Sequence, residues 1–178
     1  MAKRLARVEI GEFYAIPLFL SEYIETQRFK KAYLEGDDKL FAFCRIIDDS
    51  GVSIIIEVFK LVSKLPVTFE NILNSGRLYD PIMINGLGIY KKRWKLLGKQ
   101  ENYDKEVDSG FSNIQFVYPP LPEGTPRLWE NGQEREISFE ESEQYESSRS
   151  WSAQHLEMRI IGSLIEKDGY YFFRILLI

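Results

Sequence analysis

The sequence has little of the residue types that most catalytic and metal sites use. It contains one cysteine, Cys44, and one histidine, His155, among 178 residues. A single cysteine cannot form an intramolecular disulfide or a thiolate zinc site, and this usage fits a reducing cytoplasm. No Gly-x-Ser-x-Gly, His-Glu-x-x-His or Cys-x-x-Cys motif and no calcium-loop pattern occurs. We therefore expect no metal and no cofactor.

A long apolar run is also missing. No stretch of 18 or more uncharged apolar residues occurs, and the apolar residues that follow the basic N-terminus are interrupted by Glu9 and Glu12. We therefore predict neither a signal peptide nor a membrane span, and we expect no membrane partner.

The composition is otherwise typical of a globular protein, with 44% apolar and 14% aromatic residues. At about 100–200 residues per domain, residues 1–178 are expected to form a single domain. The net charge of −4 conceals an uneven distribution, because residues 1–100 hold 16 basic and 12 acidic side chains whereas residues 101–146 hold 3 and 12. The negative net charge therefore argues against a protein that binds nucleic acid through overall basicity.

Alternating apolar residues predict a mostly β (α+β) protein, with a twisted antiparallel sheet or a partly open barrel built from hairpins. Two β-branched and aromatic runs, at 41–47 and 52–59, flank Asp48-Asp49-Ser50-Gly51, which has the residue types of a hairpin turn. We expect further strands at residues 13–18, 81–84, 88–92 and 114–118, and a C-terminal hairpin at residues 156–178 with its turn at 167–169.

Two or three short peripheral helices are expected beside the strands. One spans residues 21–34 and ends before Gly36, and a second follows Thr68 as its N-terminal cap. Ser138 followed by Glu141 matches a capping box, which predicts a third helix through the acidic stretch.

Four of the seven prolines lie in residues 119–126, which therefore form a stiff connector. It divides a β-rich body, residues 1–118, from an acidic segment at 127–150. The C-terminal hairpin is too small to be stable alone, so we expect it to pack back on the body.

The acidic segment and Trp151, directly after it, contain the candidate binding residues. The segment forms either a solvated surface helix or a patch that covers a basic partner, because complementary charges accelerate association. Nearby tyrosine and tryptophan are residue types that anchor interfaces. The candidate partner-binding residues are Glu134, Glu136, Glu140, Glu141, Glu143, Tyr145, Glu146 and Trp151.

Two alternatives belong to other functional classes. The basic strand predicted within residues 91–99, with Trp94 inside it, could bind nucleic acid, although a solvated strand beside a buried tryptophan explains it equally well. An enzyme would need a concave site with convergent polar groups near His155 or near a pair of carboxylates.

Three short motifs carry a resemblance to a known family. They are Gly11-Glu12-Phe13-Tyr14-Ala15-Ile16-Pro17-Leu18, an aromatic strand that ends in Arg45-Ile46-Ile47, and Arg93-Trp94-Lys95-Leu96-Leu97-Gly98. Together they resemble the immunity protein 26 family of bacterial polymorphic-toxin systems over residues 7–100. The chain departs from the family pattern by an insertion at residues 19–39 and by Cys44, where glycine is common.

The resemblance implies a mostly β, cytoplasmic protein of the contact-dependent inhibition type, which binds and neutralises a cognate toxin domain and performs no catalysis. The family's signature positions are core positions, so it assigns no binding residue. Nuclease toxins have basic grooves that a row of glutamates can mimic. Our hypothesis is stoichiometric inhibition of a toxin, such as a nuclease, with residues 130–151 in the contact surface.

Overall fold

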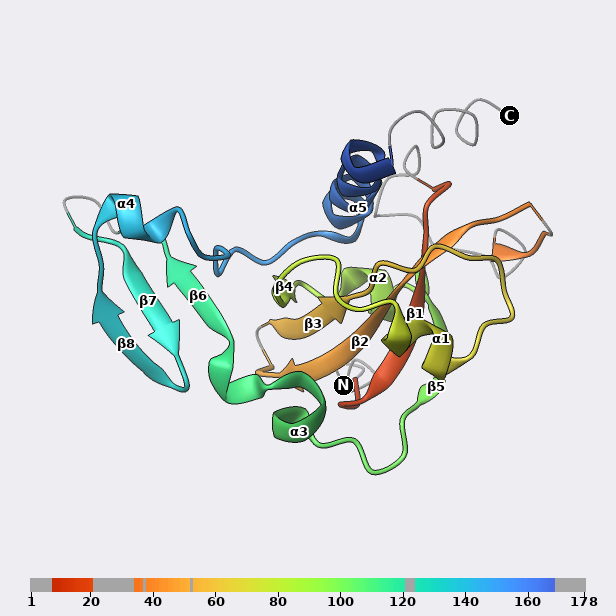
Figure 1. The fold of residues 1–178 in the computed structure, drawn as a ribbon, viewed down its shortest axis with the longest axis horizontal. Helices are drawn as coiled ribbons and strands as arrows, with labels where there is room; N and C mark the ends of the chain where they lie inside the picture. The colour runs from red at the N-terminus through yellow and green to blue at the C-terminus, as the bar shows by residue number, and fades with distance from the viewer. Residues whose placement is uncertain (1–7, 21–33, 37, 52, 121–123, 169–178) are drawn as a thin grey trace, which may run out of the picture.

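The computed structural model describes residues 8–20, 34–36, 38–51, 53–120 and 124–168 of the chain. These residues form two antiparallel sheets with peripheral helices, which confirms the mostly β, α+β class (Figure 1). The larger sheet has the order β4-β3-β2-β1-β5 and contains β1 (Glu12–Pro17), β2 (Phe41–Asp49), β3 (Ile54–Val58), β4 (Ile82–Ile84) and β5 (Lys95–Lys99). The smaller sheet has the order β6-β7-β8 and contains β6 (Gln115–Tyr118), β7 (Arg127–Glu130) and β8 (Gln133–Glu136).

The hairpin of β2 and β3 is confirmed, and its turn uses the residues that the sequence indicates. The Asp49 carboxylate accepts a hydrogen bond from the Gly51 backbone N–H at 2.8 Å. Gly51 has φ +80°, a left-handed conformation that glycine adopts without steric cost. β1 pairs with the other side of β2, from Phe13 opposite Arg45 to Pro17 opposite Phe41.

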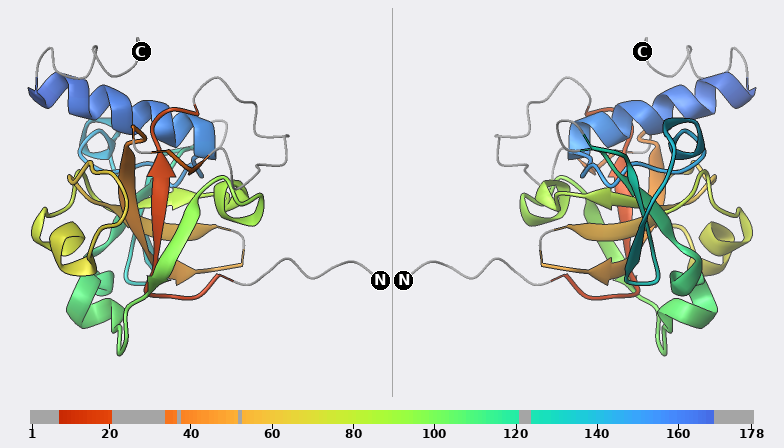
Figure 2. Two further views of the ribbon diagram at one scale, coloured as in Figure 1. Left: turned by 90° about the vertical axis from the view of Figure 1, so that its right-hand side faces the viewer. Right: turned by 90° about the vertical axis from the view of Figure 1, so that its left-hand side faces the viewer.

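One face of the larger sheet packs against the C-terminal helix α5 (Ala153–Asp168), which crosses it in Figure 2. Tyr14, Cys44 and Ile56 lie on this face, in one apolar cluster with Leu156 and Ile160 of α5. Because side chains alternate along a strand, the residues between them lie on the opposite face.

The opposite face is covered by α1 (Phe69–Asn74) and by the smaller sheet. Phe13 and Phe43 pack there with Ile72 of α1, and Ile55 packs with Phe116 of β6. Since both faces are buried, the central strands β2 and β3 are apolar at most consecutive positions.

Two of the expected helix starts are observed. Thr68 caps α1, and its side chain accepts a hydrogen bond from the Asn71 N–H. Ser138 caps α4 (Phe139–Ser142) through the Glu141 N–H, but α4 is a single turn. The acidic segment is therefore a β7–β8 hairpin followed by α4, and the third predicted helix starts where expected but does not continue through the acidic stretch. The expected helix at 21–34 falls almost entirely outside the described residues.

The C-terminal hairpin predicted at residues 156–178 was wrong, because residues 153–168 form α5. The alternation in Leu156-Glu157-Met158-Arg159-Ile160 suggested a strand, but the buried positions 153, 156, 157, 160, 161 and 164 follow helical spacing. Residues 170–178, expected to be the returning strand, lie outside the described part of the chain. No helix among the described residues is long and apolar enough to cross a membrane.

Three other predictions also need correction. Residues 88–92, expected to be a strand, contain most of α2 (Leu87–Tyr90), and in the basic segment 91–99 only Lys95–Lys99 is a strand. The boundary at residue 118 does not divide the fold, because β6 pairs with β7 across the proline-rich connector. The remaining helical elements are α3 (Lys105–Ser109) and the 3-10 turn η2 (Phe111–Asn113).

Candidate functional site

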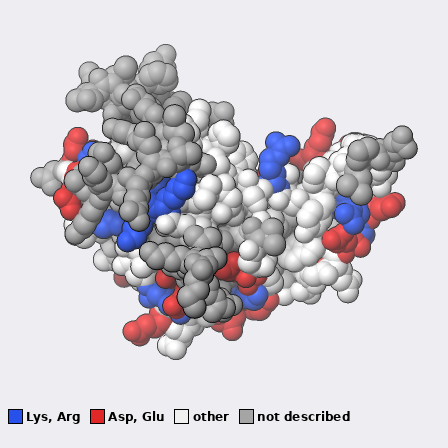
Figure 3. Space-filling model, turned by 180° about the vertical axis from the view of Figure 1, so that it is seen from behind, with Lys and Arg blue, Asp and Glu red and all other residues white. Residues whose placement is uncertain are grey.

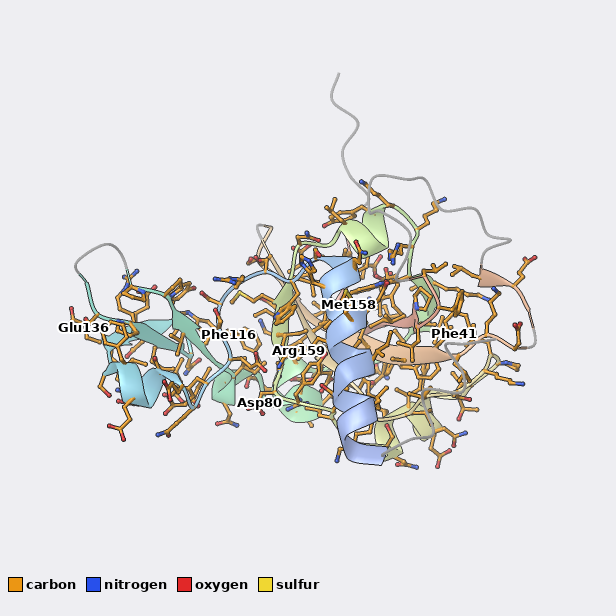
Figure 4. All side chains as sticks on the ribbon, turned by 90° about the horizontal axis from the view of Figure 1, so that it is seen from above. Phe41, Asp80, Phe116, Glu136, Met158 and Arg159 are labelled. Carbon is orange, nitrogen blue, oxygen red and sulfur yellow. The ribbon has the colours of Figure 1, made fainter. Side chains whose placement is uncertain are left out.

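A cavity of about 300 Å³ lies between the two sheets. In Figure 4, the labelled Asp80 marks this junction between the body and the smaller sheet. The walls come from the segment before β4, the end of α3, η2, the start of β6 and the segment after α4. The lining residues are Arg77, Asp80, Pro81, Ser109, Gly110, Asn113, Ile114, Gln115, Tyr145 and Glu146.

Most charged groups in this cavity make ion pairs with the protein itself. The Arg77 Nε donates to a Glu57 carboxylate oxygen at 2.5 Å, and an Arg77 Nη donates to the Ser109 carbonyl at 2.6 Å. The Glu146 carboxylate pairs with Arg159 of α5. These contacts join the smaller sheet, α3 and α5 to the body, so they indicate a structural role for the junction.

A buried polar network centred on Glu57 lies beneath the cavity. Arg45 is 2% exposed and Glu57 is 1% exposed, and the Arg45 Nε donates to Glu57 at 2.7 Å. The Ser109 hydroxyl donates to the same carboxylate at 2.8 Å, and Arg45 also donates to Gln100. The Arg45 guanidinium lies 4.7 Å from the Tyr103 ring centroid. A buried charge with these partners is fully compensated, which explains why two ionised residues persist in apolar strands.

The eight candidate residues divide into an outer group and an inner group. The outer group lies on the acidic arm, which we define as residues 127–143, containing β7, β8 and α4. It consists of Glu134, Glu136, Glu140, Glu141 and Glu143, and the arm holds six glutamates against two arginines. Four of these five glutamates are exposed, and Glu141 is partly exposed.

The two arginines of the arm neutralise two of the outer glutamates. Arg127 pairs with Glu134 at 2.7 Å, and Arg135 pairs with Glu141 at 2.5 Å. The hydrogen bond from Arg135 to Glu141 raises the pKa of the guanidinium. Within the described part of the chain, the other three outer glutamates have no cation partner. These unpaired residues are Glu136, Glu140 and Glu143.

The smaller sheet separates the outer glutamates into two sets. Leu128 lies opposite Arg135, and Trp129 lies opposite Glu134, so alternation places Glu134 and Glu136 on the Trp129 face. Arg135 lies on the Leu128 face and reaches Glu141 of α4. From the side seen in Figure 3, the arm shows acidic and basic side chains next to each other. The outer glutamates therefore do not form one continuous row.

The inner group links the acidic arm to the body and to α5. Tyr145 packs against the apolar cluster of the smaller sheet, and Trp151 forms a bridge with Ile84 of β4. Arg159 stacks 4.8 Å from the Trp151 ring centroid and pairs with Glu146. All three inner residues are partly buried, so intramolecular contacts already occupy much of their surface.

The basic segment 91–99 does not present its most distinctive side chains to solvent. Arg93 is 1% exposed and Trp94 is 2% exposed. The Arg93 Nε and the Trp94 Nε1 both donate to Glu157 of α5, at 2.7 and 3.0 Å. Lys99, which is exposed, pairs with Glu9 at 2.8 Å. This arrangement gives no support to a basic nucleic-acid-binding face.

The residues considered for catalysis lie apart from the cavity. Cys44 is fully buried in β2, and this burial raises the pKa of its thiol, which disfavours the nucleophilic thiolate. His155 is exposed in the first turn of α5. Among the described residues, no three His, Cys, Asp or Glu side chains are grouped so that they could hold a metal ion.

One exposed residue on the acidic arm was not among the sequence candidates. Phe139, the first residue of α4, is 61% exposed. Its neighbours in the sequence, Ser138 and Glu140, are polar, which is the available signal that this phenylalanine lies outside a core. The arm thus combines unpaired carboxylates with an exposed aromatic ring, a chemistry suited to contact with a basic protein surface.

Comparisons with curated proteins and with solved structures give no match to this chain. A family model described as immunity protein 26 matches residues 9–120. The match contains all five strands of the larger sheet, the buried Arg45–Glu57 pair and β6, and it ends before the acidic arm and α5. The match extends over more than half of the chain, and the chain therefore belongs to the immunity protein 26 family.

Proposed function

We propose that this protein neutralises a cognate bacterial toxin by forming a stoichiometric, non-catalytic complex with it in the cytoplasm. The family match over residues 9–120 is the observation that carries this proposal. Most charged groups of the buried polar network and of the junction cavity make internal contacts, which fits a structural role for them.

The contact surface that we propose is the outer part of the acidic arm. Glu136, Glu140 and Glu143 are exposed and have no cation partner among the residues that the structure describes. Such charges keep their full field toward solvent, so they attract a basic surface and increase the rate of association. A toxin that binds a polyanion, such as a nuclease, has a basic groove of the required sign.

Glu134 and Glu141 also lie on the acidic arm, on opposite faces of the smaller sheet, but they contribute less because Arg127 and Arg135 neutralise them. The inner group of Tyr145, Glu146 and Trp151 supports the surface by attaching the arm to the body and α5. In this proposal those three residues affect toxin binding indirectly.

Co-expression tests the proposed function directly. In a polymorphic-toxin arrangement the cognate toxin would be the C-terminal domain of a large protein encoded upstream of this chain, and that domain is the probe. Cells that express this domain alone should stop growing, and cells that also express the full chain should grow and yield a complex on affinity purification. Growth arrest that persists although both proteins are soluble and abundant would overturn the proposal.

A further inference from the structure

Phe139 is the one exposed aromatic side chain among the residues that the structure describes. Its ring belongs to none of the four apolar clusters that organise the described residues. A single exposed apolar residue is common on protein surfaces and by itself has no functional meaning. Two further features of its surroundings distinguish Phe139.

The first feature is a rigid support. The Ser138 hydroxyl accepts the Glu141 N–H at 3.0 Å, and the Ser142 hydroxyl donates to the Phe139 carbonyl at 2.6 Å. The ion pair between Glu141 and Arg135 ties the same turn to β8. The backbone of Phe139 is therefore fixed before binding, so less conformational entropy is lost when a partner covers the ring.

The second feature is the charge around the ring. Glu140 follows Phe139 on the same helical turn and Glu143 comes just after that turn, and neither has a cation partner among the described residues. An aromatic residue surrounded by polar or charged groups is the arrangement found at the energetic centre of protein interfaces. The sign of the surrounding charge defines the partner, since a carboxylate rim is complementary to lysine and arginine.

We propose that Phe139 is the apolar anchor of the toxin interface, inserting into an apolar pocket that is bordered by basic side chains on the toxin. This inference rests on the proposed function and deepens it by identifying the residue at the centre of the contact. The carboxylates accelerate the encounter, and the buried ring slows dissociation.

The test measures binding of the upstream toxin domain, in a catalytically inactive form, to the full chain by surface plasmon resonance. Phe139→Ala should raise Kd about 30-fold, mainly through faster dissociation, as expected for a hot-spot aromatic residue. Phe139→Leu, which keeps an apolar side chain, should retain most of the affinity. The thermal midpoint of both variants should match that of the wild type, because the ring contributes to no apolar cluster.

Met158→Ala provides the matched control. Met158 is 56% exposed on α5, well separated from the labelled Glu136 of the arm in Figure 4, and its replacement should leave Kd unchanged. If the wild type binds the toxin and the Kd of Phe139→Ala is within about threefold of the wild-type Kd, the proposal that Phe139 is the anchor is overturned. The proposed immunity function is not affected by that result. If the wild-type chain itself does not bind, the proposed function fails, and the anchor fails with it.

Discussion

Arg93 and Glu157 form a buried ion pair between residues 64 positions apart in the chain. The Arg93 guanidinium also donates to the Leu20 carbonyl at 2.8 Å, and Trp94 donates to the same glutamate. Arg93 and Trp94 lie inside the matched family region, whereas Glu157 lies in α5, beyond its end. This pair therefore attaches the C-terminal helix to the family core.

Replacing Glu157 with alanine should lower the free energy of unfolding by about 3–5 kcal/mol, because an uncompensated arginine would remain buried. Urea denaturation followed by circular dichroism measures the change. The matched control is Glu9→Ala, which removes one partner of the exposed Lys99–Glu9 pair and should leave the free energy of unfolding nearly unchanged. Similar losses in the two variants would contradict a structural role for the buried pair.

Removing the unpaired charges of the arm should slow association with the toxin. The variant Glu136→Gln, Glu140→Gln, Glu143→Gln should bind about tenfold more slowly at low salt, and the difference should shrink near 1 M salt, where screening shortens the range of charge interactions. Glu141 is left unchanged because its loss would free Arg135. Stopped-flow mixing with the toxin domain measures the rate.

The control for this experiment makes the same change in net charge elsewhere on the surface. Asp38→Asn, Glu70→Gln and Glu101→Gln remove three exposed carboxylates from the body. This variant should associate at nearly the wild-type rate. Equal slowing by both triple variants would show that net charge, and not the acidic arm, determines the rate.

Trp151 should affect stability more than binding. Its ring contacts the main apolar cluster and the Arg159 guanidinium, so Trp151→Ala should cost about 2–4 kcal/mol of folding free energy. At a temperature where the variant remains folded, its Kd for the toxin should stay near the wild-type value, which is the opposite of the pattern expected for Phe139→Ala. A large loss of affinity with unchanged stability would instead place Trp151 in the interface.

Cys44 should make the folded state less stable in alkali. Burial raises the pKa of its thiol in the folded protein, whereas the thiol of the unfolded chain has a pKa of about 8.5. Above that pH the unfolded chain releases a proton that the folded chain retains, so stability should fall by about 1.4 kcal/mol per pH unit. Burial raises the pKa of Tyr14 and Tyr79 as well, which adds to the loss above about pH 10.

The measurement is the free energy of unfolding in urea from pH 7 to 10, for wild type and Cys44→Ala. The variant should show a flat profile between about pH 8.5 and 9.5, where the wild type declines. The wild-type thiol should also react with a disulfide reagent only after unfolding. Rapid modification of the native protein would contradict the burial of Cys44.

The sequence predicted the elements whose local signals agree with their tertiary setting. The β2–β3 hairpin has both strand patterning and turn residues, and the Thr68 cap precedes α1 as expected. The helix α5 was missed because Glu157 is a charged residue at a buried position, which hid the helical apolar stripe. Its partner Arg93 is distant in the sequence, so no local sequence pattern indicates that the buried charge of Glu157 is paired.

The candidate site was predicted only in part, because contacts between residues that are distant in the sequence also determine it. The local density of glutamates identified the acidic arm, but Arg127 and Arg135 neutralise Glu134 and Glu141 through strand pairing and α4 packing, which composition does not reveal. Composition likewise could not show that Trp151 contacts the core, whereas the exposure of Phe139 had only the local signal of its polar neighbours.

Titration of toxin activity with the purified chain tests the central claim most directly. With a fixed amount of active toxin domain, well above the Kd, residual activity should fall linearly and reach zero at one molecule of this protein per toxin, and the toxin should recover its activity after the complex is separated under denaturing conditions and refolded. Complete inactivation at substoichiometric amounts would indicate catalysis, and full activity in the presence of excess protein would indicate no inhibition. Either result would contradict neutralisation by a stoichiometric complex.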